Sequence, residues 1–520
     1  MSEPHDAARR TLLKGAAAAA VVAAVGGRAR AGPSQPPSQL ANQMLQLAEL
    51  SAGEAVAHMS RGELRAERYA QALLARCEAA HALNAFITLE PDRVLEDARA
   101  RDRERQAGAR PGMLFGLGIP IKDSINTRDY PTTGGTPALR HFRPQQDAPV
   151  VRALKAAGAI VLGKTNLHEL SYGWTSNNLA YGAVHNPYDP ARIPGGSSGG
   201  TAAAIAARLA PLGVAEDTEG SIRVPAAFCG IMGFRPTTGR YSTEGCVPIS
   251  PLFDQVGPHA RSVADLALFD AAVAPDSRPL DAVPLRGVRL GIVRDYWFED
   301  LDAEVEHITD RALARLQDAG AQLVETPLPG VAKLIGLSTY QVQNHDVRLA
   351  LARYLKEYGA GLTLEQLLER ASPDIQALFR SDVLPGGANF VSEAQYAAAR
   401  DQYLPALRRL YRDYFVRTGV AAMVFPATRV AAPRIGEETT LLIRGRPVPF
   451  DAAVARNIAP GSTAGIPGLV LPAGLTQGGL PVALEFDAAA GTDRALLALG
   501  TSLERALGPT PAPPVRAAAP

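Results

Sequence analysis

The sequence predicts an α/β fold with a largely buried sheet and a helical cap inserted late in the chain. Two observations predict it. Short apolar runs bounded by glycine or proline alternate with stretches of helical periodicity, a pattern typical of a sheet covered by helices. The 520 residues, of which 47% are hydrophobic and 20% charged, also suffice for a large core.

The first residues differ from the rest and predict an export signal. Residues 9–15 read RRTLLKG and precede a short alanine and valine run that ends near residues 29–31, ARA. This order is typical of a twin-arginine signal with a small-residue cleavage site. The alternative is an alanine-rich helix, and the apolar run is too short to span a bilayer. We expect residues 1–31 to be removed on export, which makes the protein periplasmic or secreted, with no membrane association afterwards.

A predicted Pro/Ser linker, residues 32–39, leads into one predicted domain, residues 40–508. Up to about residue 110 the spacing is helical, with one strand at 86–89. The later predicted strands are 117–121, 159–162, 212–215, 288–293, 421–426, 468–472 and 481–486. Residues 331–419 are helical in pattern, with a break at 385–387, and we interpret them as a cap inside this domain because strands resume afterwards. Residues 509–520 predict a disordered Pro/Ala tail.

Charge and cysteine content exclude several classes of function. Lys and Arg number 53 against 52 Asp and Glu, a net charge of +1, so no basic field favours nucleic acid or an anionic membrane. A small, nearly neutral substrate suits this balance. Cys77, Cys229 and Cys246 form no metal-ligand pattern, and we expect buried apolar residues, although export would permit one disulfide. We expect no cofactor, no metal, and a monomer or homodimer.

Two matches to known motifs fail on their context. Residues 158–165, GAIVLGKT, fit the phosphate-loop pattern, yet the positions that should form a loop are an apolar run suited to a buried strand. Residues 195–199, GGSSG, fit the nucleophile-elbow pattern, yet a proline-rich polar loop precedes them where a strand is required. His168 is interpreted as a structural histidine and not as a base.

Three other segments carry groups suited to chemistry. Residues 195–200, GGSSGG, form a glycine-rich loop that opens an alanine-rich helix, where free backbone N–H groups meet the positive helix end. Ser221 lies in a polar loop after the strand at 212–215, and strand ends of an α/β sheet are where substrates usually bind. Lys122 directly follows an apolar strand and should lie partly inside the protein. Singly, such features are also typical of a turn, a helix cap and a surface lysine.

Together these segments resemble the amidase signature family, whose hallmark is a GGSSGG loop, a GSIR segment with a nearby proline, and an upstream strand that ends in Lys-Asp. The resemblance runs from about residue 40 to 508 and includes residues 164–166, 186–187, 228–230 and 233–239. It implies a mixed central sheet flanked by helices on both faces. It also implies an amidase that converts a small carboxylic amide to the acid and ammonia.

The resemblance assigns roles residue by residue. Ser221 would be the nucleophile that forms an acyl-enzyme, Ser197 the bridging serine on a cis peptide, and Lys122 the terminal base. A serine hydroxyl needs such a base, and a lysine serves only if burial and nearby donors lower its pKa. The remaining assignments are Ser198 as support for the lysine, Asp217 and Arg223 as braces of the loop, and the backbone N–H groups of Thr218, Glu219, Gly220 and Ser221 as the oxyanion hole.

One position departs from the family pattern. Many relatives have glycine where this chain has Glu219. Its backbone N–H would still serve, but a carboxylate at the mouth of the site would repel anionic substrates or bind an amino group.

Residues 171–178, 181–184 and 237–250 look most like those of hydrolases that act on arylacetamide-type substrates, such as mandelamide or indoleacetamide. Ser171, Tyr172 and Gly173 match positions that line the substrate channel in relatives. The alternatives are a glutaminase subunit of a transfer-RNA-dependent amidotransferase, which the export signal disfavours, a peptide or aryl-acyl amidase, and a non-enzymatic binding protein on an amidase scaffold, which would not require Lys122, Ser197 and Ser221 together.

Overall fold

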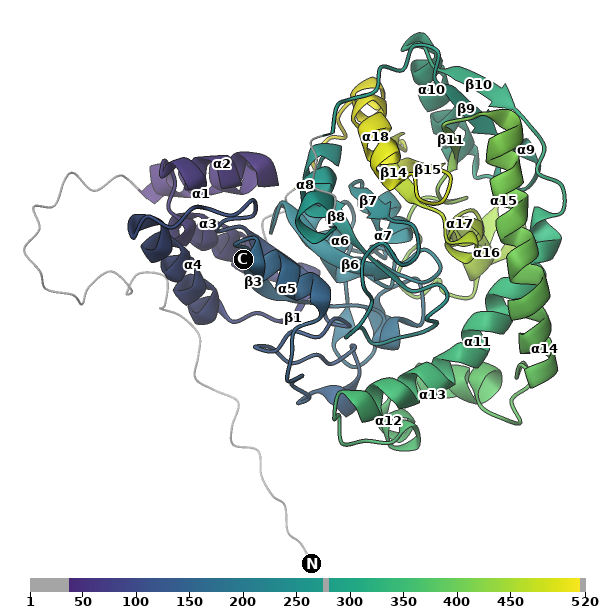
Figure 1. Ribbon diagram of the computed structural model, residues 1–520, viewed down its shortest axis with the longest axis horizontal. Helices are drawn as coiled ribbons and strands as arrows, with labels where there is room; N and C mark the ends of the chain where they lie inside the picture. Colours follow the sequence, from purple (N-terminus) through teal and green to yellow (C-terminus); the bar gives the residue numbers. More distant parts are fainter. Residues whose placement is uncertain (1–36, 275–279, 515–520) are drawn as a thin grey trace, which may run out of the picture. The chain divides into compact units, whose positions relative to one another are not determined.

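One large mixed sheet organises the chain (Figure 1). The computed structural model describes residues 37–274 and 280–514, and within them eleven strands form this sheet in the order β1-β3-β2-β6-β8-β7-β14-β15-β11-β9-β10. The pairs β2/β3, β2/β6, β9/β10 and β9/β11 are parallel and the others antiparallel. The strands are β1 Phe86–Thr88, β2 Gly118–Lys122, β3 Ile160–Thr165, β6 Leu212–Asp217, β7 Met232–Arg235, β8 Gln255–Ala260, β9 Arg289–Ile292, β10 Gln322–Glu325, β11 Ala422–Pro426, β14 Gly468–Leu475 and β15 Pro481–Asp487. Two small ribbons pair β4 Asn177–Asn178 with β5 Gly182–Ala183, and β12 Thr440–Ile443 with β13 Arg446–Pro449.

Helices cover both faces of this sheet, as the family resemblance implies. Neighbouring residues of a strand point to opposite faces. In β14, a Cβ on Gly468 would approach Arg223 of α7, whereas the next residue, Leu469, packs against Gly500 of α18. Helices α7 and α18 therefore lie on opposite sides. The helices are α1 Pro37–Glu49, α2 Ala52–Arg61, α3 Ala66–Ala79, α4 Pro91–Gln106, α5 Pro149–Ala156, α6 Gly199–Ala206, α7 Arg223–Phe228, α8 Val263–Val273, α9 Arg294–Trp297, α10 Ala303–Asp318, α11 Val331–Glu357, α12 Leu364–Arg370, α13 Pro373–Leu378, α14 Glu393–Ala398, α15 Leu404–Thr418, α16 Phe450–Val454, α17 Ala459–Ala464 and α18 Asp493–Leu507.

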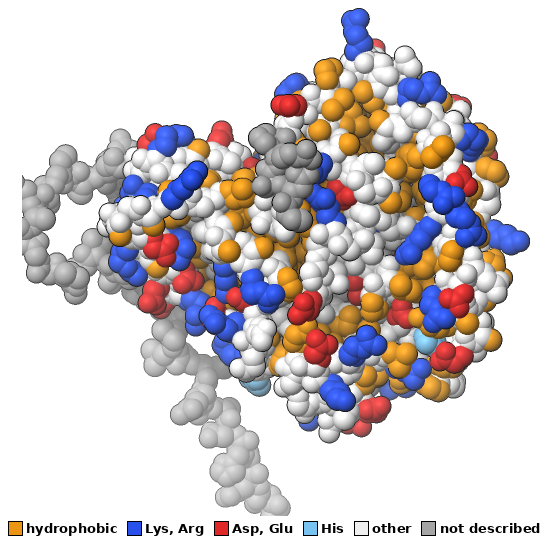
Figure 2. Space-filling view, viewed as in Figure 1, with side chains coloured by type: hydrophobic (Ala, Val, Ile, Leu, Met, Phe, Trp, Pro, Cys, Tyr) orange, Lys and Arg blue, Asp and Glu red, His pale blue; other side chains and the backbone are white. Residues whose placement is uncertain are grey.

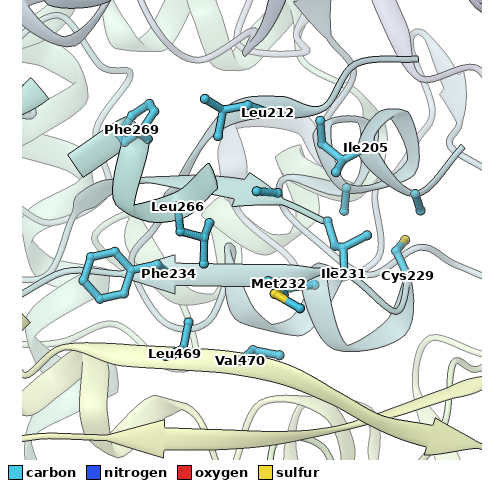
Figure 3. Packing of buried hydrophobic residues seen from close by; sticks show 14 of the residues in the cluster. Ile205, Leu212, Cys229, Ile231, Met232, Phe234, Leu266, Phe269, Leu469 and Val470 are labelled. Carbon is cyan, nitrogen blue, oxygen red and sulfur yellow. The ribbon is translucent and has the colours of Figure 1, made fainter. Parts of the chain in front are cut away.

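The largest core lies between the sheet and these helices. Figure 3 shows Leu266 and Phe269 of α8 beside Phe234 of β7 and Leu469 of β14. All four side chains are fully buried. Apolar burial on both faces is what the uninterrupted apolar runs in the strands predict.

All eight strands predicted from the sequence are present in the large sheet, and three further strands of this sheet were not predicted. Strand β8 contains Gly257 and Pro258, residues that normally argue against a central strand. Strand β10 is short, polar at both ends and lies at the sheet edge. Strand β7 is only four residues long and falls within a family motif, where no alternation is visible.

Residues predicted as a cap carry helices α11 to α15, between β10 and β11 in the chain. Val347 and Leu351 of α11 pack with Leu367 of α12 against Leu170 and Val247, which belong to loops of the sheet domain. The predicted break at 385–387 is non-helical. The cap therefore covers loops that extend from the sheet, while its boundaries as a domain stay predictions.

The terminal predictions fall largely outside the described residues. The predicted export signal, residues 1–31, lies outside them, as do the first residues of the predicted linker; the last of the linker, from Pro37, belong to α1. Of the predicted tail, residues 509–514 are described and have no regular structure. In the part of the chain that the structure covers, no helix is both long and apolar enough to cross a membrane.

The surface and the cysteines fit the composition. On the face drawn in Figure 2, basic and acidic side chains are interspersed and form no continuous field of one sign. Cys77, Cys229 and Cys246 are buried free thiols, as expected for small apolar residues, and burial raises the pKa of each.

Candidate functional site

Parallel strands place charged side chains together at one edge of the sheet. Strands β2 and β6 are neighbours, with Ile121 opposite Val214, so their carboxyl ends meet. Lys122 ends β2, and Glu216 and Asp217 end β6. The chain leaves β6 through the loop that carries Ser221 and then enters α7.

Lys122 contacts one serine and one carboxylate. Its Nζ lies 2.6 Å from Ser197 Oγ and 2.8 Å from Glu216 Oε1. The lysine is fully buried, and burial lowers its pKa because the ammonium is poorly solvated, while Glu216 acts in the opposite direction. Lys122 therefore lies within proton-transfer distance of Ser197 and has a lowered pKa, while its role as the base stays a prediction.

The glycine-rich loop brings Ser197 and Ser198 close to the carboxyl ends of β2 and β6. The Gly196–Ser197 peptide is cis, as the resemblance implies. Ser198 Oγ donates to the carbonyl oxygen of Glu216 at 3.1 Å, and Lys122 Nζ reaches the same oxygen at 3.5 Å. Ser198, predicted to support the lysine, contacts it only through this shared carbonyl.

Ser221 lies beside this group. It is 5% exposed, and the N–H of Ser198 donates to its backbone carbonyl at 3.3 Å. Its Oγ makes no hydrogen bond to any residue of the described ranges 37–274 and 280–514, Ser197 included. The contact between the two hydroxyls, required for the relay, stays a prediction.

Backbone N–H groups near Ser221 are available for an oxyanion, with one exception. The N–H of Gly220 already donates to Asp217 Oδ1 at 2.8 Å, which does not fit its predicted role as an oxyanion donor. Within the described residues, the N–H groups of Thr218, Glu219 and Ser221 make no hydrogen bond. The available donors therefore number three and not four.

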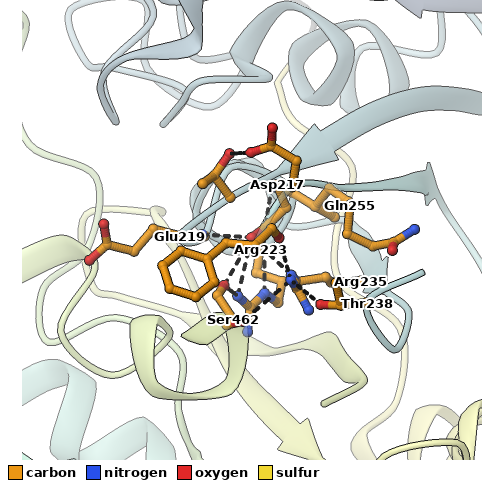
Figure 4. Close-up of polar contacts among 12 residues, drawn as sticks. Asp217, Glu219, Arg223, Arg235, Thr238, Gln255 and Ser462 are labelled. Carbon is orange, nitrogen blue, oxygen red and sulfur yellow. Dashed lines mark hydrogen bonds and ion pairs between the residues drawn. The ribbon is translucent and has the colours of Figure 1, made fainter. Parts of the chain in front are cut away.

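Asp217 and Arg223 hold the loop through a network of polar contacts (Figure 4). Asp217 accepts hydrogen bonds from the N–H of Ile222 at 3.0 Å and from Arg223 Nε at 3.1 Å, and it pairs with Arg235 at 3.3 Å. Burial alone would raise the pKa of Asp217, but the two guanidinium groups outweigh it and hold this pKa well below its usual value. Arg223 also contacts Glu485 of β15, which ties the loop to the sheet, while the supporting role of Asp217 and Arg223 in catalysis stays a prediction.

A cavity of about 100 Å³ opens beside Ser221. The three residues predicted to bind substrate, Ser171, Tyr172 and Gly173, line it, and the Tyr172 hydroxyl donates to Asn344 of the cap. The other lining residues are Trp174, Thr218, Glu219, Ser221, Ile249, Tyr340, Gln343, Asn344, Leu378 and Asp382. The small volume suits a compact substrate.

Glu219 lines the same cavity and is half-buried. Its backbone carbonyl accepts a hydrogen bond from Trp174 Nε1 at 3.3 Å. Burial raises the pKa of its carboxyl to about 8, so the group is mostly protonated at neutral pH. Its side chain is therefore predominantly uncharged there.

Two kinds of site residue escaped the sequence analysis. Glu216 follows an apolar strand just as Lys122 does, so the strand-end argument that found the lysine would also have found the carboxylate. Tyr340, Gln343 and Asn344 come from α11, where helical spacing alone does not say which side chains meet a pocket.

The rejected phosphate-loop match is a buried strand, as expected. Lys164 lies in β3 and is fully buried. Its Nζ donates to the carbonyl of Ile125 and to Thr132 Oγ1, both at 2.8 Å, and pairs with Asp123 at 3.2 Å. These contacts give Lys164 a structural role in holding the neighbouring loop.

Comparisons with known proteins agree with this architecture. A family model described as amidase matches residues 68–497. An indoleacetamide hydrolase of Agrobacterium vitis is 38% identical over 438 residues, which are 84% of this chain and 92% of the relative. A mandelamide hydrolase of Pseudomonas putida is 35% identical over 482 residues, with 89% and 93% covered. The solved structure of native peptide amidase from Stenotrophomonas maltophilia matches with a TM-score of 0.76 at 30% identity. The match covers 90% of this chain and 98% of the peptide amidase chain. The chain thus belongs to the amidase family and is a hydrolase of carbon–nitrogen bonds in amides.

Proposed function

We propose that the chain hydrolyses a small arylacetamide-type amide to its acid and ammonia through an acyl-enzyme on Ser221. The observation that carries this proposal is the contact of 2.6 Å between buried Lys122 and Ser197, next to a serine that lines a cavity. A buried amine paired with a hydroxyl is a means of removing a proton from a nucleophile.

In the proposed first step, Ser221 Oγ attacks the substrate carbonyl carbon and its proton passes to Ser197, whose own proton passes to Lys122 Nζ. Catalytic hydrogen bonds are often long without substrate and shorten in the complex, which supports a relay whose first link is open here. The returning proton leaves with ammonia, and water then attacks the acyl-enzyme by the same route.

The carbonyl oxygen gains negative charge in this step. The open N–H groups of Thr218, Glu219 and Ser221 are the proposed donors to it. Loss of one such donor typically raises the barrier by about 3 to 4 kcal/mol.

The cavity lining supports an aromatic acyl group. Tyr172, Trp174 and Tyr340 provide aromatic surface, and Ile249 and Leu378 provide apolar surface. The names of two relatives, indoleacetamide hydrolase and mandelamide hydrolase, point to the same class of substrate.

Ammonia release from a panel of amides tests the proposal. We expect the purified chain, without partners, to hydrolyse arylacetamides faster than aliphatic amides, peptide amides or glutamine. Ser221→Ala should lower kcat/KM at least about 10³-fold, because the nucleophile is lost, while circular dichroism stays unchanged. Ser242→Ala, at an exposed serine, is the matched control and should keep full activity.

Wild-type turnover in Ser221→Ala would reject the mechanism. Preference for glutamine, with activity only in the presence of partner subunits, would instead indicate an amidotransferase subunit.

We also propose export through the twin-arginine pathway, which the RR pair at positions 9 and 10 supports. Replacement of Arg9 and Arg10 by lysine should retain the protein in the cytoplasm of an expressing bacterium. Cell fractionation measures this, and unchanged periplasmic recovery would contradict it.

A further inference from the structure

The buried carboxylate of Glu216 stands directly beside the lysine. Its Oε1 lies 2.8 Å from Lys122 Nζ and accepts a second hydrogen bond from Ser124 Oγ at 3.4 Å. The side chains of Lys122 and Glu216 are 0% and 5% exposed. Water therefore contributes little to the solvation of either group, and each depends on the other.

The contacts of Lys122 Nζ allow its lone pair to point at Ser197. A neutral amine has two N–H bonds and one lone pair. Glu216 offers two acceptors, Oε1 at 2.8 Å and its backbone carbonyl at 3.5 Å, and Ser197 Oγ occupies the third direction at 2.6 Å. With both N–H groups donated to Glu216, the lone pair points at the hydroxyl from which it must take a proton.

We propose that Glu216 is a positioning residue, which aims the lone pair of Lys122 at Ser197 and stabilises the ammonium that forms as Ser221 attacks. This inference rests on the proposed function. Glu216 does not belong to the residues that line the cavity, so it acts through the lysine and not on the substrate. A base oriented by a third group is a recurrent arrangement for activating a nucleophile.

In net terms, this step moves one proton from Ser221 to Lys122 and one electron pair onto the substrate oxygen. The Ser221 O–H bond breaks, the Oγ–C bond forms, and the carbonyl π pair moves onto the substrate oxygen. Ser197 gains a proton from Ser221 and gives its own to Lys122 Nζ. Glu216 exchanges no proton in this step, and the new ammonium forms 2.8 Å from its Oε1.

Glu216 and burial act on Lys122 in opposite directions. Burial lowers the lysine pKa, and the carboxylate raises it. Removal of the carboxylate should therefore let the lysine lose its proton at lower pH. The other titratable groups that interact electrostatically with Lys122 or Glu216 are Asp217, Cys246, Asp254, His168 and His259.

Glu216→Gln tests the inference on the full chain with an arylacetamide substrate. We expect kcat to fall about 10- to 100-fold with KM nearly unchanged, because an interaction made in the transition state is lost and the pocket is not. The acidic limb of the kcat/KM profile should move to lower pH. Glu216→Asp retains the charge, so it should recover part of kcat and keep the wild-type limb.

Asp270→Asn is the matched control, because Asp270 is also a fully buried carboxylate in ion pairs, with Arg240 and Arg494, but lies in α8 away from the site. It should lower the melting temperature and leave the pH profile in place. The inference would be overturned if Glu216→Gln kept the wild-type kcat and the wild-type acidic limb of the pH profile. A change confined to KM would also overturn it.

A second measurement covers poor folding of the single variant. Lys122→Ala/Glu216→Gln removes both members of the buried Lys122–Glu216 pair, so neither side chain is left buried without its partner. We expect a fluorophosphonate probe to label Ser221 at the same rate in this variant as in Lys122→Ala, since Glu216 acts through the lysine. A further loss of rate would overturn the inference. Full activity in Lys122→Ala or Ser221→Ala would instead refute the proposed function itself.

Discussion

Burial acts oppositely on the two charge types at the site. It disfavours the ammonium of Lys122 and the carboxylate of Glu219, so the lysine pKa falls and the Glu219 pKa rises to about 8. Both shifts favour the uncharged form. The shift at Glu219 removes at neutral pH the negative charge that would repel an anion, and the carboxylate that forms as pH rises through about 8 would repel the anionic acid that hydrolysis produces.

The raised pKa of Glu219 makes stability depend on pH. Between its ordinary value of 4.5 and about 8, the folded state binds more protons at this group than the unfolded state, so stability falls as pH rises through this window. Glu219→Gln cannot ionise and should lose less melting temperature between pH 5 and pH 9 than the wild type. Thermal unfolding across that range measures the difference. Glu244→Gln, at an exposed carboxylate, should keep the wild-type slope, and equal slopes in all three proteins would contradict the prediction.

At the scale of elements, close packing of α18 on β14 depends on a missing side chain. A Cβ on Gly500 would lie 2.5 Å from Leu469 Cδ2 and 3.2 Å from Val263 Cγ1 of α8. Both neighbours are fully buried, so neither has free space to move into. Glycine therefore sets the distance between this helix and the sheet.

A pair of glycine substitutions separates packing from helix propensity. Gly500→Ala should destabilise the protein by about 1 to 3 kcal/mol through overpacking. Gly336 lies in α11, and no atom lies within 4 Å of a Cβ added there. Gly336→Ala should therefore stabilise the protein by about 0.5 to 1 kcal/mol. Urea unfolding of both variants measures whether the free energy of unfolding changes in opposite directions. A stabilising Gly500→Ala would show that α18 can shift away from Leu469.

At the scale of the whole molecule, the sequence predicts which segments are strands better than how they assemble. Apolar runs identify β2, β3 and β6, because a strand buried on both faces is apolar throughout. Strand β8 escapes because Pro258 removes a backbone donor, and its pairing with β6 and β7 makes the segment a strand. Strand order depends on tertiary contacts and has no local signal.

The same limit applies to the site. Lys122, Ser197 and Ser221 are predictable because their neighbours form motifs, and Tyr172 because its segment resembles a channel wall. The contact between Lys122 and Glu216 joins residues 94 positions apart, and no spacing in the chain encodes it. The engagement of the Gly220 N–H by Asp217 is likewise a matter of loop geometry, which a motif does not specify.

The order of the strands also has a consequence for biosynthesis. In the described sheet, β9, β10 and β11 join the remaining strands only through the hairpin of β14 and β15, which ends at Asp487, near the end of the chain. Until the ribosome has released that hairpin, β7 and β11 expose strand edges with unpaired backbone N–H and C=O groups to other nascent chains. A premature stop codon before residue 468 would therefore yield two unjoined half-sheets prone to aggregation, and not a shortened enzyme.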